Sequence, residues 1–436
     1  MLQSETVKKY DKYKDSGIEW IGEIPQNWSL VRVKHIFSQS FEKGGNDLTL
    51  LSATQNEGVI PKDRLEGVVQ VKEDADLSLF KTVKIGDFVI SLRSFQGGFE
   101  YSNFNGVITP AYTVFRNKIL INDNYFKMLF KSDGFIAKIN SLTTGIREGK
   151  NIQYDDFAYM ILPLPSIEEQ QQIAEYLDKK CGEIDRVVET EKSVIEKLKE
   201  YKQSIITEAV TKGLDKSAPL KDSGIEWIGK IPQHWGDIKL KFCTYIRARL
   251  GWKGLKAEEY VEDGYPLLSA FNIINSKLIF EDLNFINQYR YDESPEIKLQ
   301  EQDILLVKDG AGIGKCAIVE NMPISSTVNG SIAVITTNSL LMGKFLYYYF
   351  LSDLFQAYID RLKDGMGVPH LFQSDLKEIT IVIPNISEQQ QIAEYLDKKC
   401  SEIDKAIADK EQVIEKFTEY KKSLIYECVT GKRRII

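Results

Sequence analysis

The sequence predicts an α+β protein made of two related halves, each with a globular, β-rich region and a long helix. Two repeats predict this class. Residues 15–28, DSGIEWIGEIPQNW, return as residues 222–235, DSGIEWIGKIPQHW, and residues 169–181 return letter for letter as residues 388–400. Each half is far longer than a solenoid repeat, so the pattern indicates duplication of a whole domain with its helix. We expect two globular domains separated by two long antiparallel coiled-coil helices, with a pseudo-twofold internal repeat.

The repeats also set the expected domain boundaries. In order, these are an N-terminal repeated segment (1–28), a first variable region (29–165), a central helix (166–212), a linker with the second repeated segment (213–235), a second variable region (236–384), a C-terminal helix (385–431) and a tail (432–436). Enlargement of a scaffold is the alternative explanation of the duplication. It gives no reason for the variable regions to diverge while the segments around them stay nearly identical.

Composition limits the class of protein. The chain has 436 residues, enough for two to three domains, and a net charge of -7. No run of 18 apolar residues occurs, and the first residues lack a secretory signal, so we expect a cytoplasmic protein without a membrane span. Lysine and arginine number 16 against 15 acidic residues in the first variable region, and 15 against 19 in the second. Any nucleic-acid contact must therefore come from local patches, with a partner adding affinity.

The two long helices are predicted by capping and by periodicity. Ser166 with Glu169 three residues later is the pattern of a capping box, and Gly213 and Gly431 are expected to end the helices. Apolar residues then recur at spacings of three and four, which is typical of a coiled-coil seam. The seam residues are Ile173, Leu177, Ile184, Val188, Ile195, Leu198, Ile392, Leu396, Ile403, Ile407, Ile414 and Phe417. One narrow apolar stripe cannot be buried alone, so we expect the helices to pair with each other as a structural strut.

The two variable regions are predicted to share a β-rich skeleton. Three stretches in the first region match stretches in the second and read as strands closed by glycine loops. The matching pairs are 50–53 with 267–270, 86–90 with 302–306, and 161–165 with 381–384. Helical segments are expected near residues 124–139 and 342–362. Strands and helices in the same region give the α+β class.

Three loops fall at matching places in the two regions but differ in sequence, as expected for readers of different targets. The pairs are 39–45 with 247–256, 91–98 with 308–315, and 143–151 with 363–370. Glycine permits close backbone approach, while cations, amides and an indole can contact phosphates, base edges and base faces. A solvated hairpin without a ligand is the alternative for each loop. The candidate DNA-binding residues are Lys43, Arg93, Gln96, Arg147, Lys150, Asn151, Arg247, Arg249, Trp252, Lys253, Lys308, Lys315, Lys363 and His370.

The sequence offers no catalytic site and no metal site. Residues 310–316, GAGIGKC, have one residue too few between the glycines for a P-loop, and Cys316 stands where that motif needs serine or threonine. Three scattered histidines and five cysteines without a Cys-x-x-Cys pair do not form a zinc cluster, so we expect buried free thiols. We therefore expect a non-catalytic chain that carries no cofactor itself.

The duplicated layout resembles the specificity subunit of type I restriction-modification systems. The resemblance rests on the paired DSGIEWIGxIPxxW segments, each followed by a variable region that closes with PxxxEQQxIAxxL, and it covers essentially the whole chain. It implies that residues 29–165 and 236–384 are two target-recognition domains, each reading one half of a split, asymmetric DNA sequence. The long helices would be the spacers between them.

The resemblance also implies partners and cofactors. Two modification subunits would use S-adenosylmethionine to methylate adenine N6, and restriction subunits would use ATP and Mg²⁺ to translocate and cut double-stranded DNA. This chain lacks an NPPF-type methyltransferase motif and a Walker pair, which fits a recognition role. Two alternatives stay open: a coiled-coil adaptor that binds no DNA, and a fused modification enzyme, which the missing motifs disfavour.

Overall fold

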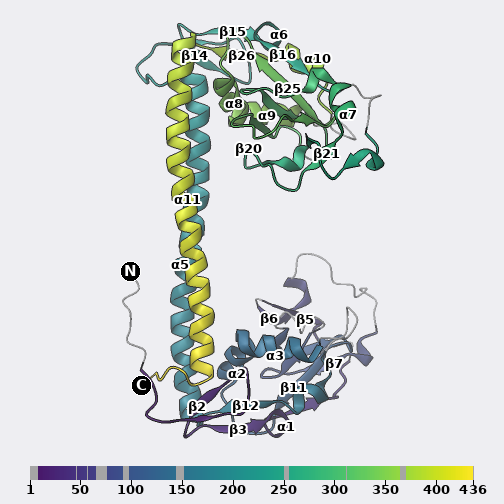
Figure 1. The fold of residues 1–436 in the computed structure, drawn as a ribbon. Coiled ribbons are helices and arrows are strands. Elements are labelled where there is room, and N and C mark those ends of the chain that lie inside the picture. The colour runs from purple at the N-terminus through teal and green to yellow at the C-terminus, as the bar shows by residue number, and fades with distance from the viewer. Residues whose placement is uncertain are drawn as a thin grey trace. The chain divides into compact units, whose positions relative to one another are not determined.

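The computed structural model describes residues 8–45, 47–55, 57–64, 76–91, 98–143, 152–249, 255–310, 312–363 and 370–435. The chain divides into two compact units, which are described separately below. Unit 1 comprises Met1–Lys192 and Glu411–Ile436, and unit 2 comprises Ser193–Lys410. Each unit contains one variable region and one half of each long helix (Figure 1).

Unit 1 is built on a four-stranded antiparallel sheet with the strand order β4-β11-β8-β9. Smaller antiparallel pairs are β1-β2, β3-β12, β5-β6 and β7-β10. The strands are β1 (Tyr13–Asp15), β2 (Glu23–Pro25), β3 (Ser29–Arg32), β4 (Phe37–Ser40), β5 (Leu51–Thr54), β6 (Gly58–Pro61), β7 (Lys81–Val83), β8 (Phe88–Ile90), β9 (Phe99–Tyr101), β10 (Gly106–Ile108), β11 (Thr113–Asn117) and β12 (Ile161–Leu164). The helices are α1 (Val33–Ile36), α2 (Asp123–Phe130), α3 (Asp133–Thr143) and α4 (Tyr154–Ala158).

The core of unit 1 is aromatic. Phe88 and Phe115 stack across β8 and β11 with ring centroids 5.5 Å apart, and Phe130 from α2 meets the ring of Phe88 edge-on at 5.4 Å. Edge-to-face and offset arrangements of this kind add to the stabilisation that burial provides. Trp28, the last residue of the first repeated segment, lies buried in the same core. The repeated segment is therefore part of the packed unit.

Unit 2 repeats this plan with a four-stranded antiparallel sheet in the order β16-β25-β22-β23. It adds a second sheet, β17-β21-β18-β24, in which β18 and β24 run parallel. The strands are β13 (Leu220–Asp222), β14 (Lys230–Pro232), β15 (Gly236–Lys239), β16 (Thr244–Arg247), β17 (Tyr260–Val261), β18 (Tyr265–Leu268), β19 (Ile273–Ile274), β20 (Lys277–Leu278), β21 (Asn284–Ile286), β22 (Ile304–Val307), β23 (Cys316–Ile318), β24 (Thr327–Val328), β25 (Ile332–Thr337) and β26 (Thr380–Ile383). The helices are α6 (Leu240–Cys243), α7 (Gln288–Asp292), α8 (Gly343–Leu351), α9 (Asp353–Lys363) and α10 (Gln373–Glu378).

The two long helices are α5 (Ile167–Lys212) and α11 (Ile386–Val429), and they pair antiparallel in each unit (Figure 1). In unit 1 the start of α5 shares a core with the end of α11, and Lys421 bonds Asp185 at 2.6 Å. In unit 2 the end of α5 shares a core with the start of α11, and Lys202 bonds Asp404 at 2.6 Å. All twelve predicted seam residues are buried or half-buried. The predicted coiled-coil seam is confirmed.

The helix ends follow the local signals in the sequence. The Ser166 hydroxyl accepts a hydrogen bond from the Glu169 amide at 3.3 Å, and Asn385 caps α11 in the same way through the Glu388 amide at 3.0 Å. Gly213 and Gly431 both have φ of +73°, the left-handed conformation that favours glycine after a helix. Both helices therefore begin and end within two residues of the predicted positions. The expected capping box is only half formed, because the Glu169 carboxylate bonds Tyr10 and Asn27 instead of the Ser166 amide.

The two shorter helical stretches were predicted at the right places, but each is a pair of helices. The first is interrupted after Phe130 and the second after Leu351. The Ser352 hydroxyl accepts a hydrogen bond from the Phe355 amide at 3.3 Å, so serine begins α9 as an N-cap. All five cysteines are buried free thiols, as predicted. Within the described ranges, no helix combines the length and the apolar character needed to cross a membrane.

Candidate nucleic-acid interface

Half of the predicted DNA-binding residues lie outside the part of the chain that the structure describes. These are Arg93, Gln96, Arg147, Lys150, Asn151, Trp252 and Lys253. Lys363 is the last residue of α9, and its side chain is likewise outside the described atoms. The geometry therefore bears on Lys43 in unit 1 and on Arg247, Arg249, Lys308, Lys315 and His370 in unit 2.

In unit 1, Lys43 is exposed on a loop that is fixed by backbone hydrogen bonds. The Gly44 amide donates to the Phe80 carbonyl at 2.9 Å, and the Thr82 amide donates to the Glu42 carbonyl at 2.8 Å. A Cβ at Gly44 would lie 2.0 Å from Cγ1 of Val107. This glycine is thus required by packing within the unit, whereas we expected it to permit close approach of a ligand.

Arg247 in unit 2 is held inside the fold. Its guanidinium donates to the Asp303 carboxylate at 2.7 Å and also bonds Thr336, and the side chain of Asp303 is fully buried. Unit 1 has an equivalent aspartate, Asp87, which directly precedes β8 as Asp303 precedes β22. Its carboxylate pairs with Arg116 of β11 at 2.8 Å. In both sheets a buried aspartate is therefore neutralised by an arginine from another strand: Arg116 lies on β11, next to β8, whereas Arg247 lies on β16, which β25 separates from β22. The Arg247 side chain, predicted as a DNA contact, is thus already paired inside the unit.

Arg249 is also buried rather than presented at the surface. Burial lowers the pKa of its guanidinium, and repulsion from Arg290 acts in the same direction. The sequence predicts one loop over residues 247–256, with cations around the Trp252 indole. The structure shows that the first two cations of this segment point into the unit.

Two of the predicted loops of unit 2 meet at one cluster, which consists of Lys308, Asp309 and His370. The Lys308 ammonium bonds the Asp309 carboxylate at 2.6 Å, and the His370 ring bonds the other oxygen of that carboxylate. The Leu371 amide donates to the Lys308 carbonyl at 2.9 Å, which fixes the two segments together. Lys308 is buried, so its charge is used mainly within this cluster.

Lys315 is the exposed cation of this part of unit 2. Its loop turns back on β22, since the Val307 amide donates to the Lys315 carbonyl at 2.8 Å and the Gly314 amide donates to the Val307 carbonyl at 3.0 Å. An exposed ammonium on a fixed loop is suited to contact a phosphate or an acceptor on a base edge. Lys43 in unit 1 and Lys315 in unit 2 are therefore the exposed residues among the described predicted contacts, whereas His370 is half-buried, with its side chain 36% exposed.

One exposed aromatic residue, on a turn that adjoins the loop of Lys315, was not predicted. Phe271 follows β18 in a 3₁₀ turn, Ala270–Asn272, and its side chain is 91% exposed. The sequence predicts a strand over residues 267–270, which stops just before Phe271. The signal that was present is Ser269 with Asn272 three residues later, a capping pattern that marks a turn rather than a longer strand.

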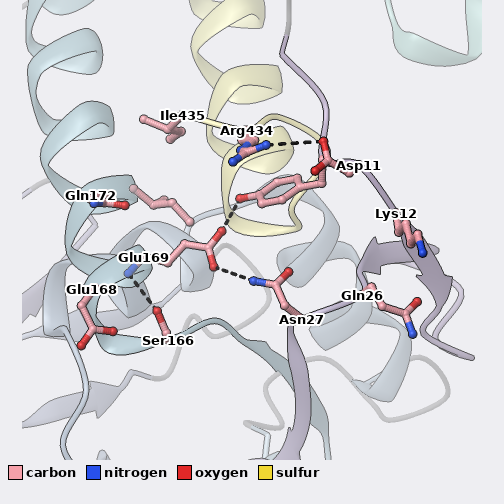
Figure 2. Close-up of a pocket in the computed structure, with 12 residues that line it drawn as sticks. Asp11, Lys12, Gln26, Asn27, Ser166, Glu168, Glu169, Gln172, Arg434 and Ile435 are labelled. Carbon is pink, nitrogen blue, oxygen red and sulfur yellow. Dashed lines mark hydrogen bonds and ion pairs between the residues drawn. The ribbon is translucent and has the colours of Figure 1, made fainter.

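The repeated segments form a second kind of site, where each contacts the start of a long helix. In unit 1 the Glu169 carboxylate accepts hydrogen bonds from the Tyr10 hydroxyl at 2.5 Å and from the Asn27 amide at 3.5 Å (Figure 2). Burial raises the pKa of Tyr10, and the bond to Glu169 adds to this. These residues line a pocket of about 610 Å³, with the Arg434–Asp11 pair at its edge.

In unit 2 the equivalent glutamate has different partners. Glu388 accepts a hydrogen bond from the Trp235 indole at 3.1 Å, and its other oxygen lies 2.8 Å from the His234 ring. His234 stands where unit 1 has Asn27. We call each repeated segment, together with the start of the long helix that it contacts, a frame. The two frames share the glutamate but differ in the side chains that contact it.

The chain matches the family model described as the type I restriction modification DNA specificity domain twice, over residues 25–200 and 253–416. It is 28% identical to the type I restriction enzyme MjaVIII specificity subunit of Methanocaldococcus jannaschii over 421 residues, which cover 94% of each chain. It is 26% identical to the EcoKI specificity subunit of Escherichia coli over 208 residues, or 47% of this chain and 44% of that one.

Solved structures have a similar fold. One chain, from a study of complex assembly and conformational transition of the type I R-M system, gives a TM-score of 0.70 at 14% identity, covering 93% of this chain and 98% of its own length. The HsdS subunit of Thermoanaerobacter tengcongensis gives a TM-score of 0.52 at 14% identity, covering 94% and 98%. At this identity the likeness concerns the fold, and it agrees with the α+β architecture of two repeated regions and long helices.

Proposed function

The chain belongs to the type I restriction modification DNA specificity family, and from this premise we propose that it reads a bipartite, asymmetric DNA sequence. Each globular region would read one half-site. The observation that carries this proposal is the contrast within the duplication: the repeated segments and helix starts are nearly identical, whereas the loops on the two matching four-stranded sheets differ.

The contact residues that we propose are Lys43 for the first half-site and Lys315 for the second. Both side chains are exposed on loops whose backbones are held by hydrogen bonds, so little backbone conformational entropy is lost when they bind. Phosphate contacts of this kind position a protein on DNA, while base contacts specify the sequence. The predicted residues outside the described ranges remain proposed contacts from their sequence alone.

The chain acts without catalysis of its own, as a recognition component beside partner subunits. We propose that two modification subunits dock on the two near-identical frames, one on each, and flip an adenine out of each half-site for N6 methylation. S-adenosylmethionine would be bound by those subunits, and ATP and Mg²⁺ by restriction subunits that translocate and cut the DNA. Among the described residues, no group of His, Cys, Asp and Glu is placed to hold a metal ion.

The long helices are proposed to set the distance between the half-sites. Each runs without interruption and contributes one half to each unit. Four residues added to one spacer helix lengthen it by about 6 Å, nearly two base-pair steps. The gap between methylated half-sites should change accordingly, and an unchanged gap would contradict this role.

The proposed function is tested by mapping methylated adenines by single-molecule sequencing in cells with and without this chain. The expected result is a split motif of two different half-sites that is methylated only when the chain is present. A gel shift with a modification subunit and DNA of that motif should show specific binding. Normal methylation in cells without the chain, together with no gel shift, would favour the coiled-coil adaptor instead.

A further inference from the structure

Phe271 is the most exposed large apolar side chain among the residues that the structure describes, at 91%. Single exposed apolar residues are common on protein surfaces and usually carry no meaning. Three further observations distinguish this one: the rigidity of its base, its neighbours, and its absence from the matching position of unit 1.

The turn that carries Phe271 is fixed on both sides. Ser269 and Asn272 form a capping box, in which the Ser269 amide donates to the Asn272 side chain at 2.9 Å and the Phe271 amide donates to the Ser269 hydroxyl at 3.3 Å. Asn272 is buried, and the Ile279 amide donates to its carbonyl at 2.9 Å. Ala270 packs on the hydrophobic core formed around β22 and β25. The turn is therefore rigid, and it holds the Phe271 ring in solvent.

The turn adjoins the loop that carries Lys315. A Cβ built at Gly312 would lie 3.9 Å from Cβ of Ala270 and 3.5 Å from Cδ of Lys315. The same loop begins at Lys308, in the cluster with Asp309 and His370 described above. An aromatic ring and an exposed cation thus lie on neighbouring segments of the surface proposed to meet the second half-site.

Unit 1 has no such ring at the matching position. The alignment of residues 50–53 with 267–270 places Thr54 opposite Phe271. The Thr54 hydroxyl is used within its own hairpin, because it donates to the Gly58 carbonyl at 3.0 Å and accepts from the Glu57 amide at 3.1 Å. The exposed ring is therefore a feature of unit 2 and not of the fold that the two units share.

We propose that Phe271 is a wedge that inserts between base pairs of the second half-site, stacks on a base and opens that step of the DNA. This inference rests on the proposed function. Apolar side chains inserted between bases unstack one step and kink the duplex, and the contacts that the bend allows offset the cost. Lys315 beside the turn would hold the adjacent backbone while the ring enters the stack.

The experiment uses the complete complex with its modification subunits and duplexes that carry 2-aminopurine at successive positions of the mapped second half-site. Stacking quenches this base, so the adenine that the modification subunit flips should give one rise in fluorescence. Binding of the wild-type complex should give a second rise, at the step that Phe271 opens. Phe271→Ala should abolish that rise and weaken binding about 5- to 150-fold, the effect of losing one base–aromatic stack. Phe271→Trp should retain the rise, because a larger ring can still stack.

Matched controls separate the possible outcomes. Thr54→Ala alters the equivalent position of the first reader and should leave the fluorescence at the second half-site unchanged. The thermal unfolding of Phe271→Ala should match that of the wild type, since the ring is exposed. If Phe271→Ala gives the wild-type fluorescence profile and affinity, the wedge is wrong while the proposed function stands. If the wild-type complex binds no DNA, both proposals fail.

Discussion

Replacing Arg247 by alanine tests whether this residue is structural or a DNA contact. The Arg247 side chain is 9% exposed and the Asp303 side chain is fully buried, and the Asp303 carboxylate also accepts a hydrogen bond from the Gln300 amide at 2.9 Å. Removal of the arginine would leave a buried carboxylate without its counterion, which costs about 3–5 kcal/mol. For a unit of this size, a loss of that amount lowers the melting temperature by roughly 6–20 °C.

The equivalent pair in unit 1 provides a comparison. Arg116 is 30% exposed, so solvent can partly replace it and Arg116→Ala should cost less than Arg247→Ala. Arg247→Lys keeps the charge and should recover part of the stability, though without the two-armed geometry of the guanidinium.

Thermal unfolding combined with hydrogen exchange of β16 and β25 is the appropriate assay, because it localises the effect to unit 2. Arg247→Ala should speed exchange in these strands while leaving β4 and β11 of unit 1 unchanged. The reasoning is refuted if Arg247→Ala unfolds like the wild type but weakens DNA binding with a smaller salt dependence, since that is the signature of a phosphate contact.

Three further predictions concern other parts of the chain. Burial raises the pKa of Glu100 to about 7 despite attraction from Lys131. The folded state should therefore lose up to about 3 kcal/mol of stability as pH rises from 4.5 to 7. Urea unfolding measures this fall, which Glu100→Gln should not show. Ser166→Ala removes the cap of α5 and should cost about 1 kcal/mol in the same assay, whereas the exposed helical control Ser204→Ala should cost nothing and stabilise slightly. Lys315→Ala should weaken DNA binding uniformly across sequences and reduce the salt slope by about 1, measured by titration at several salt concentrations; an unchanged slope would remove Lys315 from the contact surface.

The features predicted correctly from the sequence are those specified by nearby residues. The cap at Ser166, the glycines that end both helices and the three-four spacing of the seam each depend on residues within a few positions of one another. The matching strands of the two variable regions are likewise predicted from runs of a few neighbouring residues. The capping signal at Ser352 is equally local, but it lies within a continuous helical pattern that predicts one helix where the structure has two.

The candidate site was less predictable because its decisive contacts are distant in sequence. Arg247 meets Asp303, 56 residues away, and His370 meets Asp309, 61 residues away. The local sequence around Arg247, with cations followed by glycine and tryptophan, would be the same whether the arginine side chain faces solvent or a buried carboxylate. Which of these occurs depends on the sheet that brings the two strands together.

The most direct test of the account is exchange of residues 29–165 for the first variable region of another member of the family. Methylated adenines would then be mapped by single-molecule sequencing in cells that carry the hybrid chain. The account predicts that one half of the methylated motif changes, while the other half keeps its sequence. A change in both halves, or in neither, would contradict the claim that each region reads its own half-site.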